Sequence, residues 1–356
     1  MEDLMFNNKC ILITGGTGSL GKVLVRRLLT KESGKPKKII VFSRDEAKQH
    51  EMRMMYKNLT FATDEIIYHN FEEILGFYIG DVRDRHSVAA VLKDVDIVFN
   101  AAALKQVPTC EYFPYDAVMT NITGAENIVR VIRENCLPVE MVVGISTDKA
   151  CKPINVMGMS KAIQERIFVN GNIGCPETRF ICVRYGNVLA SRGSVIPLFL
   201  EQIYNGGPVT ITTTDMTRFL ISLDKAVDAI FAAVREAHPG ETYIPNTPSA
   251  QVVDIADILI GSHKVEKKIT GIRPGEKIHE VLVSEEECHR TVSRGKYFVI
   301  QPILPELRKS VTAETYLKGE YNSANNLMSR EELASFLKEE KLLEYTFAEK
   351  KGELLR

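Results

Sequence analysis

The sequence lacks the long apolar run that a membrane-spanning helix requires. No uncharged stretch among its 356 residues approaches the ~18 residues of such a helix. The N-terminus is acidic and carries no basic segment followed by an apolar one, so it does not resemble a secretory signal. We therefore expect a cytoplasmic protein that is not inserted in a membrane.

An excess of charge of either sign is also absent. The 45 Lys and Arg residues nearly balance the 46 Asp and Glu residues, which gives a net charge of −1. A protein with this balance has no general attraction for nucleic acid or for an anionic membrane, and neither is expected as a partner. A local basic pocket remains compatible with the overall balance.

Patterns for metal binding and for disulfides are missing as well. The seven cysteines are scattered and form no CxxC pair, and the seven histidines show no HExxH motif. We predict no metal site and no disulfide framework. The cysteines are interpreted as free thiols in a reducing cytosol.

What the first half of the sequence does contain is an alternation of short apolar runs with amphipathic stretches. The apolar runs predict strands at residues 9–14, 38–42, 76–79, 95–101, 139–145 and 180–183. Most of the segments between them have helical patterns. This alternation predicts an α/β fold, with a Rossmann-type doubly wound parallel sheet and helices on both faces.

A glycine-rich turn follows the first predicted strand and opens a helix. It reads TGGTGSLG, with glycines in the GxxGxxG spacing. Such glycines allow a sharp turn, a close approach of the backbone to a pyrophosphate, and packing of the helix on the strand. The turn predicts a dinucleotide site formed by Gly15, Thr17, Gly18, Ser19, Leu20 and Gly21.

The end of the second strand distinguishes between two dinucleotides. An NAD site places an acidic residue there to bind the ribose hydroxyls, whereas this chain has Ser43 and Arg44. Arg44 can pair with a 2′-phosphate, so NADP is favoured over NAD. The alternative is that Arg44 is solvated and Asp45 binds the ribose. Residues after the third and fourth strands should complete the cofactor crevice, namely Asp81, Val82, Ala101, Ala102 and Ala103.

Beyond about residue 191, segments rich in Gly, Pro and Thr replace the strand–helix rhythm. We expect a smaller α+β lobe there that binds substrate and is interleaved with the sheet domain. The expected boundaries are 1–190 for an NADP-binding Rossmann domain and 191–356 for mainly the substrate lobe and a C-terminal tail. Some segments of the second part should return to the Rossmann domain.

Motifs that span roughly the first 280 residues are similar to those of one family. The chain carries, in order, TGGTGSLG, FSRDE, GDVRD, NAAALKQVP, STDKA, PINVMGMSK, RYGNVLASRGSVIP, MTRF and GIRPGEKIHE. It thereby resembles the extended short-chain dehydrogenase/reductases. Within them it looks like the UDP-N-acetylglucosamine 4,6-dehydratases of polysaccharide biosynthesis.

The resemblance implies a hydro-lyase that acts on a UDP-sugar and assembles as a homo-oligomer. In that family carbon 4 of the sugar is oxidised by hydride transfer to NADP⁺, water is eliminated across carbons 5 and 6, and the hydride returns to carbon 6. Carbon 5 is inverted or retained in different relatives. The alternatives are a nucleotide-sugar 4-epimerase, which needs no acid–base pair at carbons 5 and 6, and a non-catalytic NADP-sensing protein.

The resemblance also gives roles to the strip after the fifth strand. Lys149 matches the base for the carbon 5 proton, Asp148 the acid for the carbon 6 hydroxyl, and Thr147 a hydroxyl that binds the sugar near carbon 4. A base must be neutral, so we expect burial or a nearby cation such as Lys161 to lower the pKa of Lys149. Out of context, an Asp-Lys pair would be interpreted as a solvated turn.

One position departs from the superfamily pattern of Tyr, three residues, then Lys. Lys161 is present and is expected to bind the nicotinamide ribose, but Met157 stands at the Tyr position. A thioether cannot take a proton, so another group must accept the proton of the carbon 4 hydroxyl. Our hypothesis is that Asp148 or a water molecule accepts this proton. Some members of the dehydratase subgroup are similar in having Met there, and Met157 is either an inert core residue or a residue that shapes the substrate site.

The later motifs imply substrate contacts. Arginines suit a diphosphate, and a carboxylate suits ribose hydroxyls. The candidate substrate residues are Lys105, Asn187, Arg192, Arg218, Arg273 and Glu276.

Overall fold

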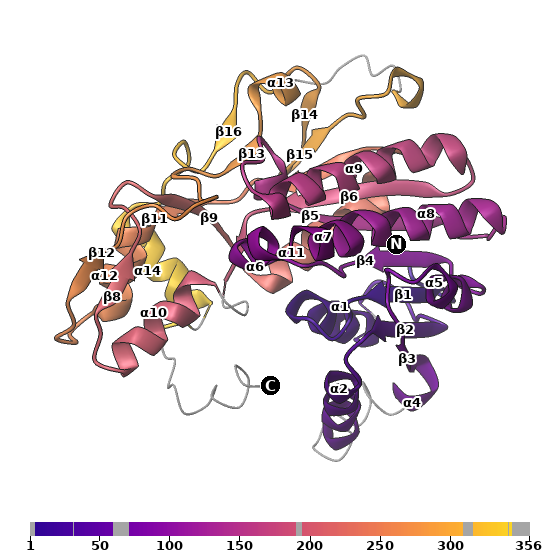
Figure 1. The fold of residues 1–356 in the computed structure, drawn as a ribbon, viewed down its shortest axis with the longest axis horizontal. Coiled ribbons are helices and arrows are strands. Elements are labelled where there is room, and N and C mark those ends of the chain that lie inside the picture. The colour runs from indigo at the N-terminus through magenta and orange to yellow at the C-terminus, as the bar shows by residue number, and fades with distance from the viewer. Residues whose placement is uncertain are drawn as a thin grey trace.

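A nine-stranded sheet forms the centre of the larger part of the molecule. The computed structural model describes residues 4–30, 32–59, 71–189, 194–308, 316–340 and 342–343. In these ranges the strand order is β14-β15-β10-β6-β5-β4-β1-β2-β3, and the strands from β3 to β10 are parallel. Helices cover both faces of this sheet (Figure 1). The prediction of a doubly wound Rossmann-type sheet is confirmed.

Six strands of this sheet lie close to the positions expected from the apolar runs, whereas β10, β14 and β15 were not predicted. From one edge to the other the strands are β3 (Leu75–Ile79), β2 (Lys38–Ser43), β1 (Cys10–Thr14), β4 (Ile97–Asn100), β5 (Met141–Thr147), β6 (Arg179–Tyr185), β10 (Thr242–Pro245), β15 (Tyr297–Ile300) and β14 (Thr291–Arg294). The last two form an antiparallel hairpin at the edge.

The two faces of the sheet have separate hydrophobic cores because neighbouring side chains of a strand point in opposite directions. In β1, Ile11 and Ile13 pack in one core and Leu12 in the other. The first core includes residues of α1 (Ser19–Leu29), α2 (Glu46–Leu59) and α11 (Leu223–Glu236). The second includes residues of α5 (Arg85–Leu92), α8 (Gly124–Glu134) and α9 (Val156–Gly174). A strand buried on both faces reads as a continuous apolar run, which explains the sequence pattern.

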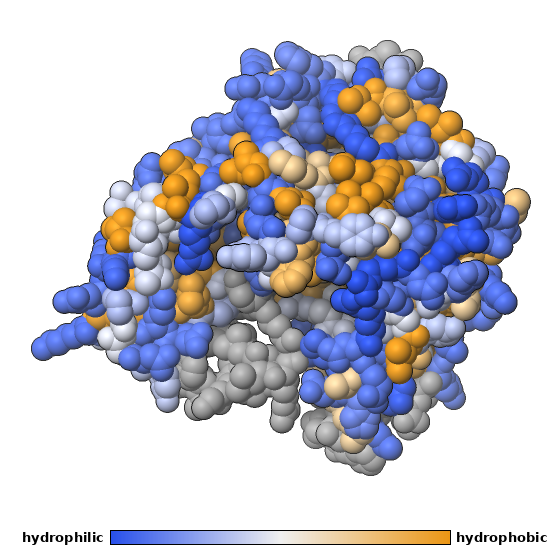
Figure 2. Space-filling view, in the orientation of Figure 1, coloured by the Kyte–Doolittle hydropathy of each residue, from blue (hydrophilic) through white to orange (hydrophobic). Residues whose placement is uncertain are grey.

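Short helical segments lie between these elements. They are α4 (Phe71–Ile74), α6 (Val107–Tyr112), α7 (Pro114–Ala117), the π-helical turn η1 (Val118–Thr123), and the 3₁₀ turns η2 (Asp148–Ala150) and η3 (Pro305–Leu307). Figure 2 shows apolar side chains gathered over α6, α7 and α9. They include the exposed Phe113, Ile154, Met159 and Ile163. Exposed apolar patches often mark interaction surfaces, and the homo-oligomer stays a prediction.

A smaller lobe packs beside the sheet, at the left in Figure 1. Its own core joins two small sheets and three helices. These elements are β7 (Asn187–Val188), β9 (Thr217–Ile221), β11 (Ser249–Gln251), β8 (Val209–Ile211), β12 (Lys267–Ile269), α10 (Val195–Tyr204), α12 (Val252–Ile260) and α14 (Arg330–Glu339). A further pair, β13 (Val281–Val283) and β16 (Tyr321–Asn322), lies with α13 (Glu285–Cys288) above the sheet.

The chain passes between the two parts more than once. At β7 it enters the small lobe, yet the later α11, β10, β14 and β15 belong to the large sheet or pack on it. The smaller α+β lobe is therefore interleaved with the sheet, whereas the boundary at residue 190 stays a prediction. No helix in the described ranges is long and apolar enough to span a membrane.

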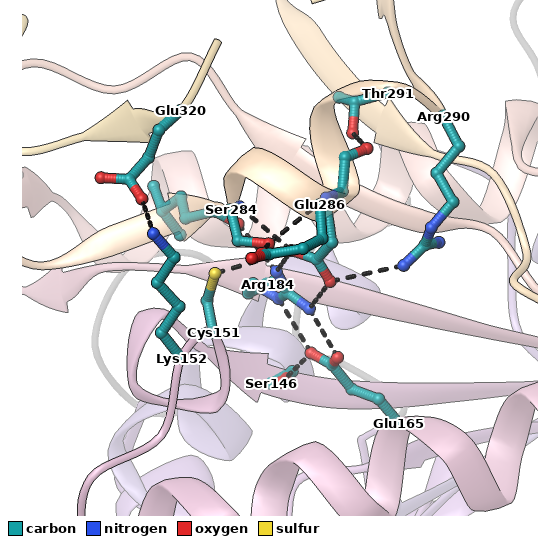
Figure 3. Close-up of polar contacts among 12 residues, drawn as sticks. Ser146, Cys151, Lys152, Glu165, Arg184, Ser284, Glu286, Arg290, Thr291 and Glu320 are labelled. Carbon is teal, nitrogen blue, oxygen red and sulfur yellow. Dashed lines mark hydrogen bonds and ion pairs between the residues drawn. The ribbon is translucent and has the colours of Figure 1, made fainter.

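A buried arginine connects the sheet and α9 to the segment of β13 and α13 (Figure 3). Arg184 of β6 forms a two-bond ion pair with Glu165 of α9, with distances of 3.0 and 2.7 Å. It also donates to Glu287 of α13 at 2.8 and 3.0 Å, and to the Leu282 carbonyl of β13 at 2.8 Å. Burial on its own would raise the pKa of Glu287, but the charge and hydrogen bonds of Arg184 outweigh it and lower that pKa to about 2. The Glu287 carboxylate is thus held ionised although its side chain is largely buried.

We predict that Arg184→Met destabilises the protein by about 3–5 kcal/mol, because it leaves two buried carboxylates without their cation. Urea unfolding at neutral pH measures the change. Arg130→Met is the matched control, since Arg130 pairs with Glu134 on an exposed helix face and its loss should leave the unfolding midpoint nearly unchanged. Equal midpoints for Arg184→Met and the wild type would contradict a stabilising role for this contact.

Candidate active site

A cavity of about 1050 Å³ lies where the carboxyl ends of the parallel strands meet the small lobe. Its walls include residues that follow β1, β2, β3, β4, β5 and β6, and others from β9 and from the loop before β13. Sites for one small ligand commonly measure roughly 300–1,000 Å³. The cavity is therefore large enough for a dinucleotide and a second ligand together.

The cavity brings together nearly all residues singled out in the sequence. The glycine turn, the strand-end residues and the strip after β5 all line it. Its lining includes Gly15, Thr17, Gly18, Ser19, Leu20, Gly21, Ser43, Arg44, Asp81, Val82, Ala101, Ala102, Ala103, Lys105, Thr147, Asp148, Lys149, Met157, Lys161, Asn187, Arg218, Arg273 and Glu276. Arg192 lies outside the described residues.

The glycine turn packs directly against the backbone that follows β4. Gly15 has a positive φ of 64°, and a Cβ there would lie 2.8 Å from the backbone nitrogen of Ala102. The N-cap of α1 is Gly18, so no side chain caps the first amides of that helix. Uncapped amides and the helix dipole attract an anionic group. The turn thus fits a dinucleotide pyrophosphate.

At the end of β2, charged side chains of both signs line the cavity. The Arg44 side chain is 55% exposed and its Nη1 atom lies 3.6 Å from Oδ2 of Asp81. Asp45, the alternative ribose ligand, already accepts hydrogen bonds from the backbone amide and the ammonium of Lys48. Lys48 also lines the cavity and adds a second cation there. Lys48 stands four residues after Arg44, in the first turn of α2, and the sequence analysis did not identify it.

The end of β5 and the start of α9 position the strip of residues 147–149. Thr147 Oγ1 donates to Asp148 Oδ1 at 2.9 Å, and Asp148 is fully buried. Asn155 caps α9 by accepting from the Gly158 amide at 2.7 Å. A Cβ on Gly158 would lie 2.2 Å from the Lys149 carbonyl oxygen, so α9 can pack this closely on the turn only with glycine there. The solvated-turn alternative for the Asp-Lys pair is wrong.

Glu280 faces this strip from the other side and was not identified in the sequence. Its Oε1 atom lies 3.1 Å from the Lys149 ammonium, which is equally far from Oδ1 of Asp148. Arg218 approaches the same Glu280 oxygen at 3.8 Å. Glu280 is the last residue of the GIRPGEKIHE motif, and only Arg273 and Glu276 were chosen from that motif.

The expectation of a lowered pKa for Lys149 is wrong in this structure. Burial would lower that pKa, but the charges of Asp148 and Glu280 outweigh it and raise the value above that of an ordinary lysine. The nearby cation that opposes them is Arg218, not Lys161. Burial and the charge of Glu280 raise the pKa of Asp148 against the effect of Lys149. Lys149 is therefore an ammonium at rest, between two carboxyl groups.

Met157 is both a core residue and part of the cavity wall. Its side chain is 5% exposed and packs in a small cluster with Cys110 and Ala117. One turn later, Lys161 donates to Gln164 at 2.7 Å, and burial lowers its pKa to about 8. No proton-accepting group thus stands on α9 at the position where the superfamily has its tyrosine.

Several buried polar atoms on the cavity wall have no partner. Buried polar groups are normally hydrogen-bonded, so such atoms indicate where a ligand binds. Among the described residues they include Thr120 Oγ1, Asp148 Oδ2, Asn187 Oδ1, Ser194 Oγ and Glu280 Oε2. The described part of the chain holds no group of His, Cys, Asp and Glu side chains that could bind a metal ion.

Known proteins with similar sequences carry different names. The chain is 42% identical over 301 residues to a protein of Campylobacter jejuni named UDP-N-acetylglucosamine 4,6-dehydratase (inverting), covering 84% of each chain. It is 44% identical over 301 residues to a protein of Rickettsia bellii named UDP-glucose 4-epimerase, covering 83% of this chain and 84% of the other.

The fold matches a solved structure over almost the whole chain. The X-ray structure of Pen from Bacillus thuringiensis superimposes with a TM-score of 0.84 and is 32% identical, covering 95% of this chain and 99% of the other. The sequence model of the family described as "Polysaccharide biosynthesis protein" matches residues 11–302. The chain therefore belongs to this polysaccharide biosynthesis protein family, within the extended short-chain dehydrogenase/reductases.

Proposed function

We propose that this protein is an NADP-dependent hydro-lyase that converts UDP-N-acetylglucosamine to a UDP-4-keto-6-deoxy-N-acetylhexosamine for glycan or polysaccharide biosynthesis. One observation carries the proposal. Asp148 and Lys149 form an acid–base pair, 3.1 Å apart, in the same cavity as a dinucleotide-type glycine turn. An epimerase needs only chemistry at carbon 4, whereas an elimination across carbons 5 and 6 needs both an acid and a base.

The cofactor side of the cavity suits NADP. The uncapped start of α1 would hold the pyrophosphate, and Arg44 with Lys48 would hold the 2′-phosphate. Lys161, buried and hydrogen-bonded to Gln164, is the candidate for the nicotinamide ribose. When bound, NADP⁺ would supply the hydride acceptor for carbon 4 and the hydride donor for carbon 6.

The other side of the cavity suits a nucleotide sugar. Arg218 and Arg273 supply positive charge for a diphosphate, and Glu276 supplies a carboxylate for ribose hydroxyls. Lys105 and the unpartnered amide oxygen of Asn187 add further polar groups to the wall. The position of Arg192 is not described, and its role rests on the sequence alone.

Asp148 can serve in two successive steps. Its Oδ2 atom is buried without a partner and its pKa is raised, so the carboxylate can accept the proton of the carbon 4 hydroxyl. Thr147, bonded to the other oxygen, orients the group. The neutral acid then gives this proton to the departing carbon 6 hydroxyl, which leaves as water. Lys149 takes the carbon 5 proton and later returns it.

Incubation with UDP-N-acetylglucosamine and NADP⁺ in heavy water, followed by NMR of the product, tests the proposal. We expect a 4-keto-6-deoxy sugar with deuterium at carbon 5, and the coupling pattern reports whether carbon 5 is inverted. Formation of UDP-N-acetylgalactosamine without water loss would show an epimerase instead. No conversion of the sugar by an enzyme with bound cofactor would reject both.

We expect Lys149→Met to lower turnover by about 10²–10⁴-fold, the usual contribution of a positioned acid–base group, and to leave substrate binding nearly intact. Lys152→Met is the matched control, because Lys152 pairs with Glu285 and Glu320 outside the cavity. Turnover is measured from the amount of product formed, and substrate binding is measured by calorimetry, so that the two effects are separated. Full activity of Lys149→Met would refute the role of the base, whereas a wild type that binds the cofactor without any turnover would favour the non-catalytic alternative.

We expect Arg44→Ala to weaken NADPH binding by about 10- to 100-fold while the affinity for NADH stays nearly constant, since a charge-assisted pair contributes about 1.5–3 kcal/mol. Arg53→Ala is the control, because Arg53 stacks on Phe77 and does not line the cavity. Fluorescence titration with both reduced dinucleotides measures the preference. An unchanged ratio of the two affinities would contradict the assignment of Arg44.

A further inference from the structure

The loop that carries two candidate substrate residues, Arg273 and Glu276, is only partly covered by the rest of the molecule. Arg273 and Pro274 are exposed, Gly275 and Glu276 are half-buried, and all four line the cavity. Within the loop, the Glu276 amide donates to the Arg273 carbonyl at 3.1 Å and so closes a tight turn. Such a turn must be held from elsewhere in the molecule if its side chains are to meet a ligand at a fixed position.

The capping residue of α9 holds this loop. Asn155 accepts from the Gly158 amide with its side-chain oxygen, and its side-chain nitrogen donates to the Gly275 carbonyl at 2.7 Å. Asn155 is buried. Gly275 has a positive φ of 78°, and a Cβ there would lie 3.1 Å from Cβ of Asn155 and 3.4 Å from Cγ1 of Val107 on α6. The loop therefore packs directly on the start of α9 and on α6.

A second bond joins the same two segments. The ammonium of Lys277, two residues after Gly275, donates to the Cys151 carbonyl at 2.6 Å. Cys151 directly follows the turn that carries Lys149, and Asn155 comes four residues after Cys151. The loop is thus bonded at two places to the short segment that runs from the catalytic turn to α9.

Resting on the proposed function, we propose that Asn155 is a positioning residue for the nucleotide part of the substrate. Through the Gly275 carbonyl it fixes the turn from which Arg273 and Glu276 reach the diphosphate and the ribose of UDP. Asn155 itself is not among the residues that line the cavity, so it acts through the loop and does not touch the substrate. One side chain then performs two tasks, because its oxygen orders the start of α9 while its nitrogen holds the loop.

The chemistry of the amide explains why asparagine suits this position better than another helix cap. Ser, Thr, Asp and Asn all cap helices, because each has a side-chain oxygen that accepts from the first amides. Asp has no donor for a carbonyl, and in Ser or Thr a single oxygen would have to serve both bonds. Asn has a separate acceptor and donor, and at position 155 both are used.

The variant Asn155→Asp separates this role from helix capping. Asp keeps an acceptor for the Gly158 amide but has no donor for the Gly275 carbonyl. We expect the Kd for UDP, measured by calorimetry, to rise about 10-fold, as for the loss of one hydrogen bond. The Kd for NADPH and the midpoint of thermal unfolding should stay nearly unchanged. An unchanged affinity for UDP, or an equal loss of affinity for NADPH, would overturn the proposal.

Two further variants complete the test. Asn155→Ser also keeps a cap and lacks the amide nitrogen, so it should weaken UDP binding even if Asn155→Asp folds poorly. Asn135→Asp is the matched control, because the Asn135 amide donates to the Val131 carbonyl at 2.9 Å at the end of α8, and Asn135 does not line the cavity. It should bind UDP as the wild type does. Equal losses of UDP affinity in Asn135→Asp and Asn155→Asp would contradict a specific role for Asn155.

Kinetics and binding together distinguish a failure of this proposal from a failure of the proposed function. In Asn155→Asp, KM for UDP-N-acetylglucosamine should rise by the same factor as the Kd for UDP and kcat should stay nearly unchanged, because the lost contact serves ground state and transition state equally. A lower kcat with an unchanged KM would refute the role of Asn155. Binding of UDP needs no turnover, so a wild type that binds UDP without converting the sugar would reject the proposed function alone. A wild type that does not bind UDP would reject both.

Discussion

The buried guanidinium of Arg184 holds together the two parts of the molecule whose side chains meet in the cavity. It is bonded to Glu165 on the sheet side and to Glu287 on the side of β13 and α13 (Figure 3). The residues on either side of the catalytic strip join the same carboxylates: Ser146 donates to Glu165, and the Cys151 thiol contacts Glu287. The turn that carries the acid and the base is thus anchored at both ends by one ion cluster.

The same ion cluster also helps to position Glu280, whose carboxylate faces the turn. Arg184 also binds the Leu282 carbonyl, two residues after Glu280. Burying these charges costs free energy that well-packed apolar residues would not require, so stability alone does not account for them. Their directional bonds do fix how the loop before β13 meets the end of β5. We infer that the geometry between Lys149 and Glu280 is what the network secures.

The sheet and the glycine turn could be predicted because their causes are local. A strand covered on both faces must be apolar along its length, and Gly15 is required where the backbone passes Ala102 at a positive φ. The same locality explains what was missed. Glu280 gains its importance from a contact with a turn far away in the sequence, and no local pattern marks it. The pKa of Lys149 was predicted in the wrong direction because the charge of the neighbouring Asp148, together with that of the distant Glu280, outweighs burial.

The methionine at position 157 connects these observations. With a tyrosine there, α9 would carry a proton acceptor, and much of the acid–base work could be done within the sheet domain. With Met157 packed against Cys110, the carboxylates that face Lys149 are Asp148, on the turn after β5, and Glu280, on a loop bonded to the residue after β16. The charge on Lys149 then depends on the correct assembly of both parts of the molecule. The buried ion cluster at Arg184 therefore contributes to the chemistry as well as to the fold, because it helps to hold Asp148 and Glu280 at bonding distance from Lys149.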